Sequence, residues 1–125
     1  FDDGLYSAAR LIEILSTTNP DLDAALEQFP NPIGTPEIYI DVSEEKKFDI
    51  MARVAMEARF ANGKLNSIDG LRVDLPNGWG LIRVSNTTPR LVLRFEADSS
   101  DDLADIKQQF REELARIEPA LPLPF

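Results

Sequence analysis

Residues 78–97 read GWGLIRVSNTTPRLVLRFEA and predict two strands joined by one polar loop. The second half of this stretch alternates apolar and polar residues with a period of two, which suits a strand with one face buried and one face in water. The first half is more continuously apolar, which indicates a strand that is covered over most of its length. Between the two strands lies the hydroxyl-rich segment Arg83–Pro89.

The chemical groups of this loop are those that bind anions. Hydroxyl and amide groups come from Ser85, Asn86, Thr87 and Thr88, and a tight loop can add its own backbone N–H groups. Arg83 supplies a planar guanidinium, which can bond two oxygens of one phosphate group. The loop is therefore a candidate anion site.

Charge is distributed unevenly around the loop. The stretch 70–95 contains four arginines and one aspartate, whereas the chain of 125 residues carries a net charge of −9 at pH 7. Two interpretations follow: the arginines form an anion site, or they pair with the chain's own carboxylates on the surface of a structural hairpin. Because short polar loops are common, the local residues alone favour the structural hairpin.

Composition limits the classes of function. With 125 residues, of which 43% are hydrophobic and 28% charged, the chain is typical of one globular domain with appended elements. Its acidic balance argues against nucleic acid or an anionic membrane surface as the main partner. No apolar run has the length of a membrane span.

The chain has no histidine and no cysteine. This excludes Ser-His-Asp and Cys-His nucleophile systems, disulfides, and zinc sites built on imidazole or thiolate. The aspartate pairs Asp2-Asp3 and Asp101-Asp102 each precede a helical pattern, where helix capping is favoured over metal binding. We therefore expect no catalytic residue, no metal site and no cofactor in this chain.

About the first thirty residues are predicted to be helical. Apolar residues at helical spacing indicate a helix over about residues 3–16, capped by Asp2 or Asp3. Asn19 as N-cap and Pro20 as the first helical residue predict a short second helix.

The proline-rich segment Pro30–Pro36 predicts a stiff connector. The chain begins with Phe1 rather than methionine, which suggests a piece of a longer protein. We expect residues 1–33 to be the end of a preceding domain with a hinge connector, and residues 34–125 to form a separate C-terminal domain.

The chain after the connector predicts an α+β fold. Period-two alternation indicates three strands besides the hairpin: 38–42, 64–68 and 71–75. Helical patterns span about 44–61, capped by Ser43, and 100–118, capped by Ser99 or Ser100. We expect a mostly antiparallel sheet of about four strands with two helices packed on one face.

The first of these two helices has a two-sided pattern. Its core-facing side is predicted to carry Phe48, Met51, Ala52, Val54, Ala55 and Ala58. Charged residues, Lys46 and Asp49 among them, fall on the opposite side. The proline-rich end, 121–125, is expected to be extended and tucked against the domain.

The loop and its flanks resemble a known family. Three segments carry the resemblance: Asp69–Asp74 (DGLRVD), Gly78–Gly80 (GWG) and Arg83–Ala97 (RVSNTTPRLVLRFEA). They look like the C-terminal domain of the α-D-phosphohexomutases and, within that family, of the bacterial phosphomannomutase/phosphoglucomutase enzymes. Residues 1–10 (FDDGLYSAAR) are similar to the end of the third domain of these enzymes, so the resemblance covers essentially the whole chain.

The resemblance implies a fold and a set of binding residues. The fourth domain of these enzymes is similar in fold to the TATA-box-binding protein, with no implication of DNA binding. Its loop holds the phosphate of the sugar substrate, so Arg83 would clamp that phosphate, and Ser85, Asn86 and Thr87 would complete its shell. Thr88 fits variants of the motif and receives no role. Asn86 stands where glucosamine-type members have glycine, which favours the mannose/glucose class.

The resemblance also implies the activity of the parent chain. Phosphohexomutases are isomerases that interconvert 6-phospho- and 1-phosphosugars through a bisphosphorylated intermediate, and rotation about the connector opens and closes their site. Their phosphoserine, Mg²⁺ loop and sugar-selecting loop lie in three earlier domains, which no segment of this chain matches. We expect this fragment to be inactive, and the full-length cytoplasmic enzyme to use Mg²⁺ and glucose 1,6-bisphosphate.

The implied partners are a phosphosugar and the other three domains of the parent chain, without nucleic acid or membrane. The alternative is a non-enzymatic protein-interaction domain, in which the arginine-rich loop meets acidic partners.

Overall fold

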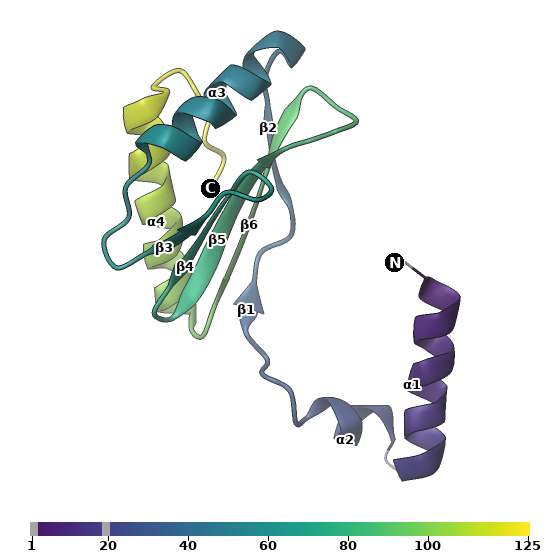
Figure 1. Ribbon diagram of the computed structural model, residues 1–125. Helices are drawn as coiled ribbons and strands as arrows, with labels where there is room; N and C mark the ends of the chain where they lie inside the picture. The colour runs from purple at the N-terminus through teal and green to yellow at the C-terminus, as the bar shows by residue number, and fades with distance from the viewer. Residues whose placement is uncertain (1–2, 19–20) are drawn as a thin grey trace. The chain divides into compact units, whose positions relative to one another are not determined.

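The structure, a computed structural model, describes residues 3–18 and 21–125 (Figure 1). The chain divides into two compact units, Phe1–Asn31 and Pro32–Phe125. The first unit ends two residues before the boundary that we placed after residue 33. Within the described ranges, no helix combines the length and the apolar character that a membrane span requires.

The first unit contains two helices, α1 Gly4–Thr18 and α2 Leu22–Leu26, and neither helix buries a residue. At the start of α1, the Asp3 carboxylate accepts a hydrogen bond from the backbone N–H of Tyr6 at 2.9 Å. This bond makes Asp3 the cap, one of the two aspartates expected there. The other candidate, Asp2, lies outside the described residues.

An aspartate caps the start of helix α2. The carboxylate of Asp21 accepts a hydrogen bond from the backbone N–H of Ala24 at 2.8 Å, so Asp21 is the N-cap. This bond satisfies one of the N–H groups that a helix leaves without an internal partner. The predicted cap Asn19 and first helical residue Pro20 lie outside the described residues.

The second unit is built on one antiparallel sheet of six strands. The strands are β1 Ile33–Gly34, β2 Ile38–Asp41, β3 Lys64–Asn66, β4 Leu71–Leu75, β5 Gly78–Val84 and β6 Arg90–Ala97. Their order is β1-β6-β5-β4-β3, and β2 also pairs with β6 (Figure 1). The α+β class and the antiparallel sheet are confirmed, with more strands than the four expected.

Strand β1 lies in none of the five segments that we predicted as strands. Its two residues pair with Glu96 and Ala97 of β6, and the N–H of Thr35 donates to the carbonyl of Phe95 at 2.9 Å. A strand of two residues among prolines has no periodicity that could reveal it. The second half of the segment Pro30–Pro36 therefore belongs to the sheet and is not a separate connector.

Helices α3 Glu44–Glu57 and α4 Ser100–Ile117 pack on one face of the sheet (Figure 1). The strand residues beneath them are at most 1% exposed: Leu71, Val73, Ile82, Leu91, Leu93, Phe95 and Ala97. Phe95 meets Phe110 of α4 edge to face, with ring centroids 5.1 Å apart. Gly80 pairs with Phe95 in the sheet, and a Cβ at Gly80 would lie 2.4 Å from the Phe110 ring. Glycine there lets the ring approach the strand.

The buried side of α3 differs from the predicted side. Phe48 is 59% exposed, and Ala52 and Ala55 are also exposed, although all three were expected in the core. The helix buries one stripe: Lys47, Ile50, Met51 and Val54. Because Lys47 is charged, a helical wheel excludes it from the buried side. The apolar side of the wheel then centres on residues near Phe48 and the alanines, which explains the error. The helix also ends at Glu57, four residues before the predicted end at residue 61.

The predicted caps of α3 and α4 and the predicted packing of the tail agree with the structure. Ser43 caps α3, and Ser99, one of the two candidates, caps α4 by accepting a hydrogen bond from the N–H of Asp102 at 3.1 Å. Both serines satisfy N–H groups of a first helical turn. Leu121 and Phe125 are buried in the core, so the C-terminal tail packs against the domain as predicted.

Candidate functional site

The candidate site is the loop 85–89, which connects β5 to β6. The N–H of Ser85 donates to the carbonyl of Arg90 at 2.9 Å, and the N–H of Arg90 donates to the carbonyl of Thr88 at 2.8 Å. The first bond continues the hairpin pairing to the base of the loop, and the second closes a tight turn within Thr88–Arg90. They leave Asn86 and Thr87 as its exposed tip.

Inside the loop, the hydroxyl oxygen of Ser85 accepts several hydrogen bonds. The donors are the Thr88 hydroxyl at 2.8 Å, the Thr88 N–H at 3.2 Å and the Thr87 N–H at 3.4 Å. A hydroxyl has two acceptor lone pairs and one hydrogen to donate, so the remaining capacity of Ser85 is as a donor. Thr88, to which the resemblance assigns no role, therefore holds Ser85 in place.

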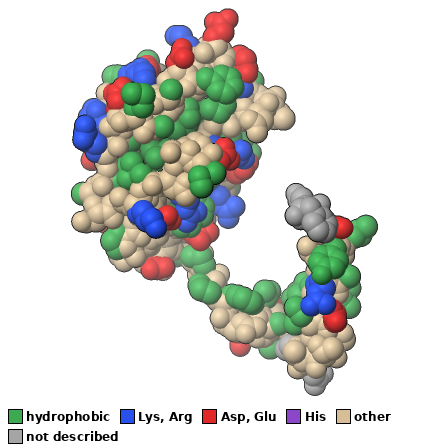
Figure 2. Space-filling model, viewed as in Figure 1, with side chains coloured by type: hydrophobic (Ala, Val, Ile, Leu, Met, Phe, Trp, Pro, Cys, Tyr) green, Lys and Arg blue, Asp and Glu red, His purple; other side chains and the backbone are tan. Residues whose placement is uncertain are grey.

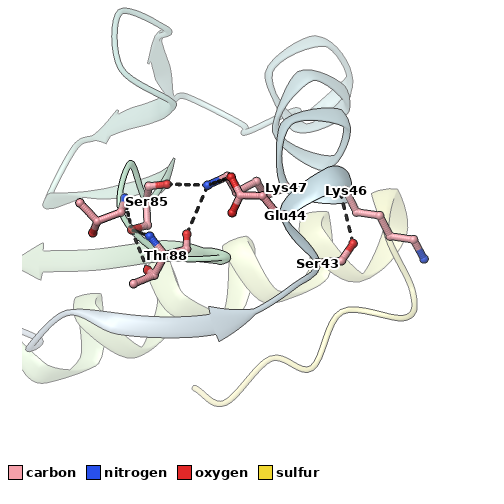
Figure 3. A network of polar contacts seen from close by, with 7 residues as sticks. Ser43, Glu44, Lys46, Lys47, Ser85 and Thr88 are labelled. Atoms are coloured by element: carbon pink, nitrogen blue, oxygen red, sulfur yellow. Dashed lines mark hydrogen bonds and ion pairs between the residues drawn. The ribbon is translucent and has the colours of Figure 1, made fainter.

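A buried lysine supports the loop from the side of α3 (Figure 3). Lys47 is 2% exposed, and its Nζ donates to the carbonyl oxygens of Ser85 at 3.0 Å and Thr88 at 3.3 Å. The same ammonium forms an ion pair with Glu44, one turn earlier in α3, at 2.6 Å. The sequence analysis missed this residue. The sequence did contain a signal: Lys47 lies at helical spacing from three apolar residues, Ile50, Met51 and Val54, so it belongs to the same stripe of the helix.

Arg83 lies on the sheet face away from the helices, because its neighbour Ile82 points into the core. Its side chain is 32% exposed, and its guanidinium is 3.9 Å from a carboxylate oxygen of Glu37. This distance is beyond a hydrogen bond. Among the described residues, no acceptor takes a hydrogen bond from the Arg83 guanidinium, so its donors face solvent or a ligand.

Strand β2 and the residue before it, Glu37, supply carboxylates that contact Arg83 and Arg90. The Tyr39 hydroxyl donates to Glu37, and this hydrogen bond, with the negative charge of Glu37, raises the pKa of Tyr39 above its ordinary value. Arg90, at the end of the loop, pairs with Asp41 at 2.5 Å and lies over the Tyr39 ring at 5.5 Å from its centre. Arg90 is therefore engaged within the domain.

The other two arginines of the predicted basic group lie further along the same face. Arg72 pairs with Asp74 at 2.7 Å and lies 4.1 Å from the centre of the Trp79 ring, and Arg94 is 4.0 Å from Glu96. Figure 2 shows basic and acidic side chains next to one another over this unit. Two of the four arginines, Arg72 and Arg90, thus form hydrogen-bonded pairs with carboxylates. Arg83 and Arg94 lie 3.9 and 4.0 Å from their nearest carboxylates and keep their donors.

The structure brings the four expected site residues to one end of the β5–β6 hairpin. Arg83 extends from β5, Ser85 forms the base of the loop, and Asn86 and Thr87 form its exposed tip. Together they offer a guanidinium, hydroxyl groups, an amide and backbone N–H groups, which is a donor set that suits a phosphate.

Nothing in residues 3–18 and 21–125 resembles a metal centre: no three His, Cys, Asp or Glu side chains are grouped to hold an ion. Of the paired aspartates, Asp102 accepts hydrogen bonds from the Ser99 hydroxyl and from the Asn77 amide, the latter at 2.7 Å. These bonds lower the pKa of Asp102. The residue thus acts at the start of α4, as a helix-terminal carboxylate does.

Comparisons with known proteins give consistent matches. The family described as "Phosphoglucomutase/phosphomannomutase, C-terminal domain" matches residues 37–113. A phosphomannomutase/phosphoglucomutase of Pseudomonas putida is 57% identical over 125 residues, which is all of this chain and 27% of the relative. A phosphoglucomutase of Neisseria meningitidis is 46% identical over 114 residues, which is 89% of this chain and 24% of the relative.

Among solved structures, the crystal structure of a phosphoglucomutase/phosphomannomutase family protein from Burkholderia thailandensis matches with a TM-score of 0.87 and 44% identity. The match covers 100% of this chain and 26% of that protein. The chain therefore spans about a quarter of the length of the relatives that it matches.

Proposed function

Because the chain belongs to the phosphoglucomutase/phosphomannomutase family, matching its C-terminal domain, we propose that it binds the phosphate group of a phosphosugar. In this proposal the parent chain is an isomerase. It interconverts 6-phospho- and 1-phosphosugars of the mannose and glucose class through a bisphosphorylated intermediate, and this domain grips the phosphate that is not reacting.

The observation that carries the proposal is that the guanidinium of Arg83, in the strand that leads into the loop, makes no hydrogen bond to a described residue. Its contact with Glu37 at 3.9 Å is not a hydrogen bond, so a phosphate dianion can take its place with two parallel N–H···O bonds. The Ser85 hydroxyl keeps a hydrogen to donate, and Asn86 and Thr87 are exposed next to it. The loop thus has unused donors where a ligand can reach them.

Binding at this loop positions a sugar and breaks no bond. A phosphate held firmly at a distance from the reacting centre fixes the orientation of the rest of the substrate. The described residues contain no group of carboxylates that fits Mg²⁺, so no step of the proposal runs through a metal in this chain. The reacting groups belong to the other parts of the parent protein.

The proposal is tested by adding inorganic phosphate or glucose 1-phosphate to the ¹⁵N-labelled chain and following its amide signals. We expect residues 85–88 to shift in the millimolar range, which corresponds to about 4 kcal/mol of binding free energy. Arg83→Ala should raise the Kd by about 10- to 100-fold, because a hydrogen-bonded charge contributes about 1.5–3 kcal/mol.

The matched control is Arg94→Ala, an arginine on the same face of the adjacent strand with 53% of its side chain exposed. It should leave the Kd within about twofold, since exposed pairs contribute little. Loop signals that ignore phosphate at high concentration, or equal effects of the two substitutions, would contradict the proposal. A loop that responds to acidic peptides but not to phosphate would favour the protein-interaction alternative.

A further inference from the structure

Lys47 is the one charged side chain in the buried part of the described residues, at 2% exposure. Burying a charge is unfavourable unless the group is paired and fully hydrogen-bonded. The position of this lysine, inside the apolar stripe of α3, therefore needs a reason beyond packing. An apolar side chain of similar length would fill the same space without the loss of hydration.

The partners of Lys47 show where its charge is used (Figure 3). An ammonium has three hydrogens to donate, and Lys47 has three partners. One is the Glu44 carboxylate at 2.6 Å, on its own helix. The other two are the carbonyl oxygens of Ser85 and Thr88, at 3.0 and 3.3 Å, which are 38 and 41 residues away in the sequence. These two carbonyls bracket the loop tip.

The contact between Lys47 and the Ser85 carbonyl also sets the direction of the next backbone N–H, that of Asn86. The carbonyl of Ser85 and the N–H of Asn86 belong to one peptide unit, and in a trans peptide they point to opposite sides. No cis peptide bond occurs in the described residues. Since the Ser85 carbonyl points to Lys47, the Asn86 N–H points away from α3. Within the described part of the chain, no acceptor takes a hydrogen bond from that N–H.

The contact between Lys47 and the Thr88 carbonyl fixes the segment of the loop that leads into β6. The peptide unit after Thr88 ends at Pro89, which has no N–H. Holding the Thr88 carbonyl therefore adds no donor to the site. Instead it fixes the residue whose N–H and hydroxyl bind the Ser85 oxygen. Lys47 thus restrains both sides of the tip from one point in the core.

We propose that Lys47 is the positioning residue of this anion site: it holds the carbonyls of Ser85 and Thr88 and thereby presents the Asn86 N–H to a bound phosphate. The inference rests on the proposed phosphate-binding role of the loop. Lys47 itself does not touch the ligand. It acts by ordering the loop before binding, so that less freedom is lost when the phosphate arrives.

The test uses Lys47→Met in the 125-residue chain, which removes the charge and keeps an unbranched side chain that suits a buried site. Lys46→Met is the matched control, because Lys46 is the adjacent, exposed residue of the same helix. Lys47→Gln, which keeps N–H donors without the charge, is the second variant if the methionine protein does not fold. Urea unfolding gives the folded fraction of each protein.

The first measurement is made without ligand. We expect the ¹⁵N order parameter of the Asn86 amide to fall from about 0.85 to below about 0.6 in Lys47→Met and to stay unchanged in Lys46→Met. A loop that remains equally ordered without the ammonium would overturn the inference. This measurement decides the role of Lys47 in the loop whether or not phosphate binds.

The second measurement is a titration with inorganic phosphate. If the loop of Lys47→Met is in the binding shape about a tenth of the time, the Kd rises about tenfold. Lys46→Met should bind as the unmodified chain does. A purely structural lysine would lower the stability and leave the Kd of the folded protein unchanged, which would overturn the inference. Failure of the unmodified chain to bind phosphate would instead overturn the proposed function.

Discussion

The two faces of the sheet are built differently. On the helix side, strand residues such as Val73, Ile82 and Phe95 are completely buried. On the other face, charged and aromatic side chains remain partly in water, with Arg72 over Trp79 as one example. Each buried methylene contributes about 0.8 kcal/mol, whereas an exposed ion pair contributes about 0–1 kcal/mol. The covered face therefore holds the domain together, and the open face is free to carry charged groups.

This separation is visible within a single strand. Ile82 and Arg83 are neighbours in β5, yet Ile82 is fully buried and the Arg83 side chain is 32% exposed. A strand with a period of two can place a core residue and an exposed, charged residue side by side. If Arg83 binds phosphate as we propose, a change there should alter binding without unfolding the domain.

The largest effect is expected from the covered face. Phe95 packs against the rings of Phe110 and Phe125, each with its centre 5.1 Å away. Phe95→Ala removes these contacts and leaves a cavity, so the free energy of unfolding should fall by about 3–5 kcal/mol in urea unfolding. The control Arg94→Ala, next in the strand and on the open face, should change it by less than about 0.5 kcal/mol. Similar losses of unfolding free energy in Phe95→Ala and Arg94→Ala would show that the two faces do not differ in their contribution to stability.

A smaller effect is expected from the best-packed group of the open face. Arg72 pairs with Asp74 at 2.7 Å and lies 4.1 Å from the centre of the Trp79 ring. Arg72→Ala should lower the free energy of unfolding by about 1 kcal/mol, since both contacts are partly exposed. Urea unfolding again gives the value. A loss above about 2 kcal/mol would mean that the open face also stabilises the fold.

The smallest effect is expected at the outer edge of the helix layer. A hydrogen bond from Arg116, with another from the N–H of Arg59, lowers the pKa of Glu113. A carboxylate with a lowered pKa contributes fully above its unfolded pKa of about 4.3 and loses that contribution as the pH falls through the folded value. Glu113→Gln should therefore lower the free energy of unfolding by a few tenths of a kcal/mol at pH 7.

The check on this prediction is the same unfolding experiment at pH 7 and at about pH 3, below the ordinary carboxyl range. The gap between the unmodified chain and Glu113→Gln should shrink on acidification. A gap that widens would show that the carboxylate is unfavourable where it lies. Charged groups at the outer helix surface would then lower the stability of the domain, in contrast to the ion pairs on the open face of the sheet.

Features that depend on neighbours in the chain were predictable from the sequence. The alternation of β6 and the capping serines Ser43 and Ser99 follow from local rules and agree with the structure. The expected site residues follow one another between Arg83 and Thr87, so a single motif names them all. Their role in binding phosphate stays a prediction until the titration is made.

Features that depend on contacts between distant segments were not predictable. Lys47 contacts a loop carbonyl 38 residues away, and the helical pattern of α3 does not predict that contact. The same lysine misled the assignment of the buried side, because a wheel counts it as polar. Strand β1 was not predicted for a related reason: its two residues form a strand only through their pairing with β6.

The way the chain enters the sheet has a mechanical consequence. From Ile33 to Asp41 it runs against β6, so that its first residue pairs with Ala97 and its last with Arg90, beside the loop. A pull that lifts the chain before Ile33 away from β6 would break these hydrogen bonds one at a time, beginning at the Ala97 end. Under such a pull the pairing of β1 with β6, remote from the loop, would break first, and the pairing of Asp41 with Arg90, beside the loop, would break last.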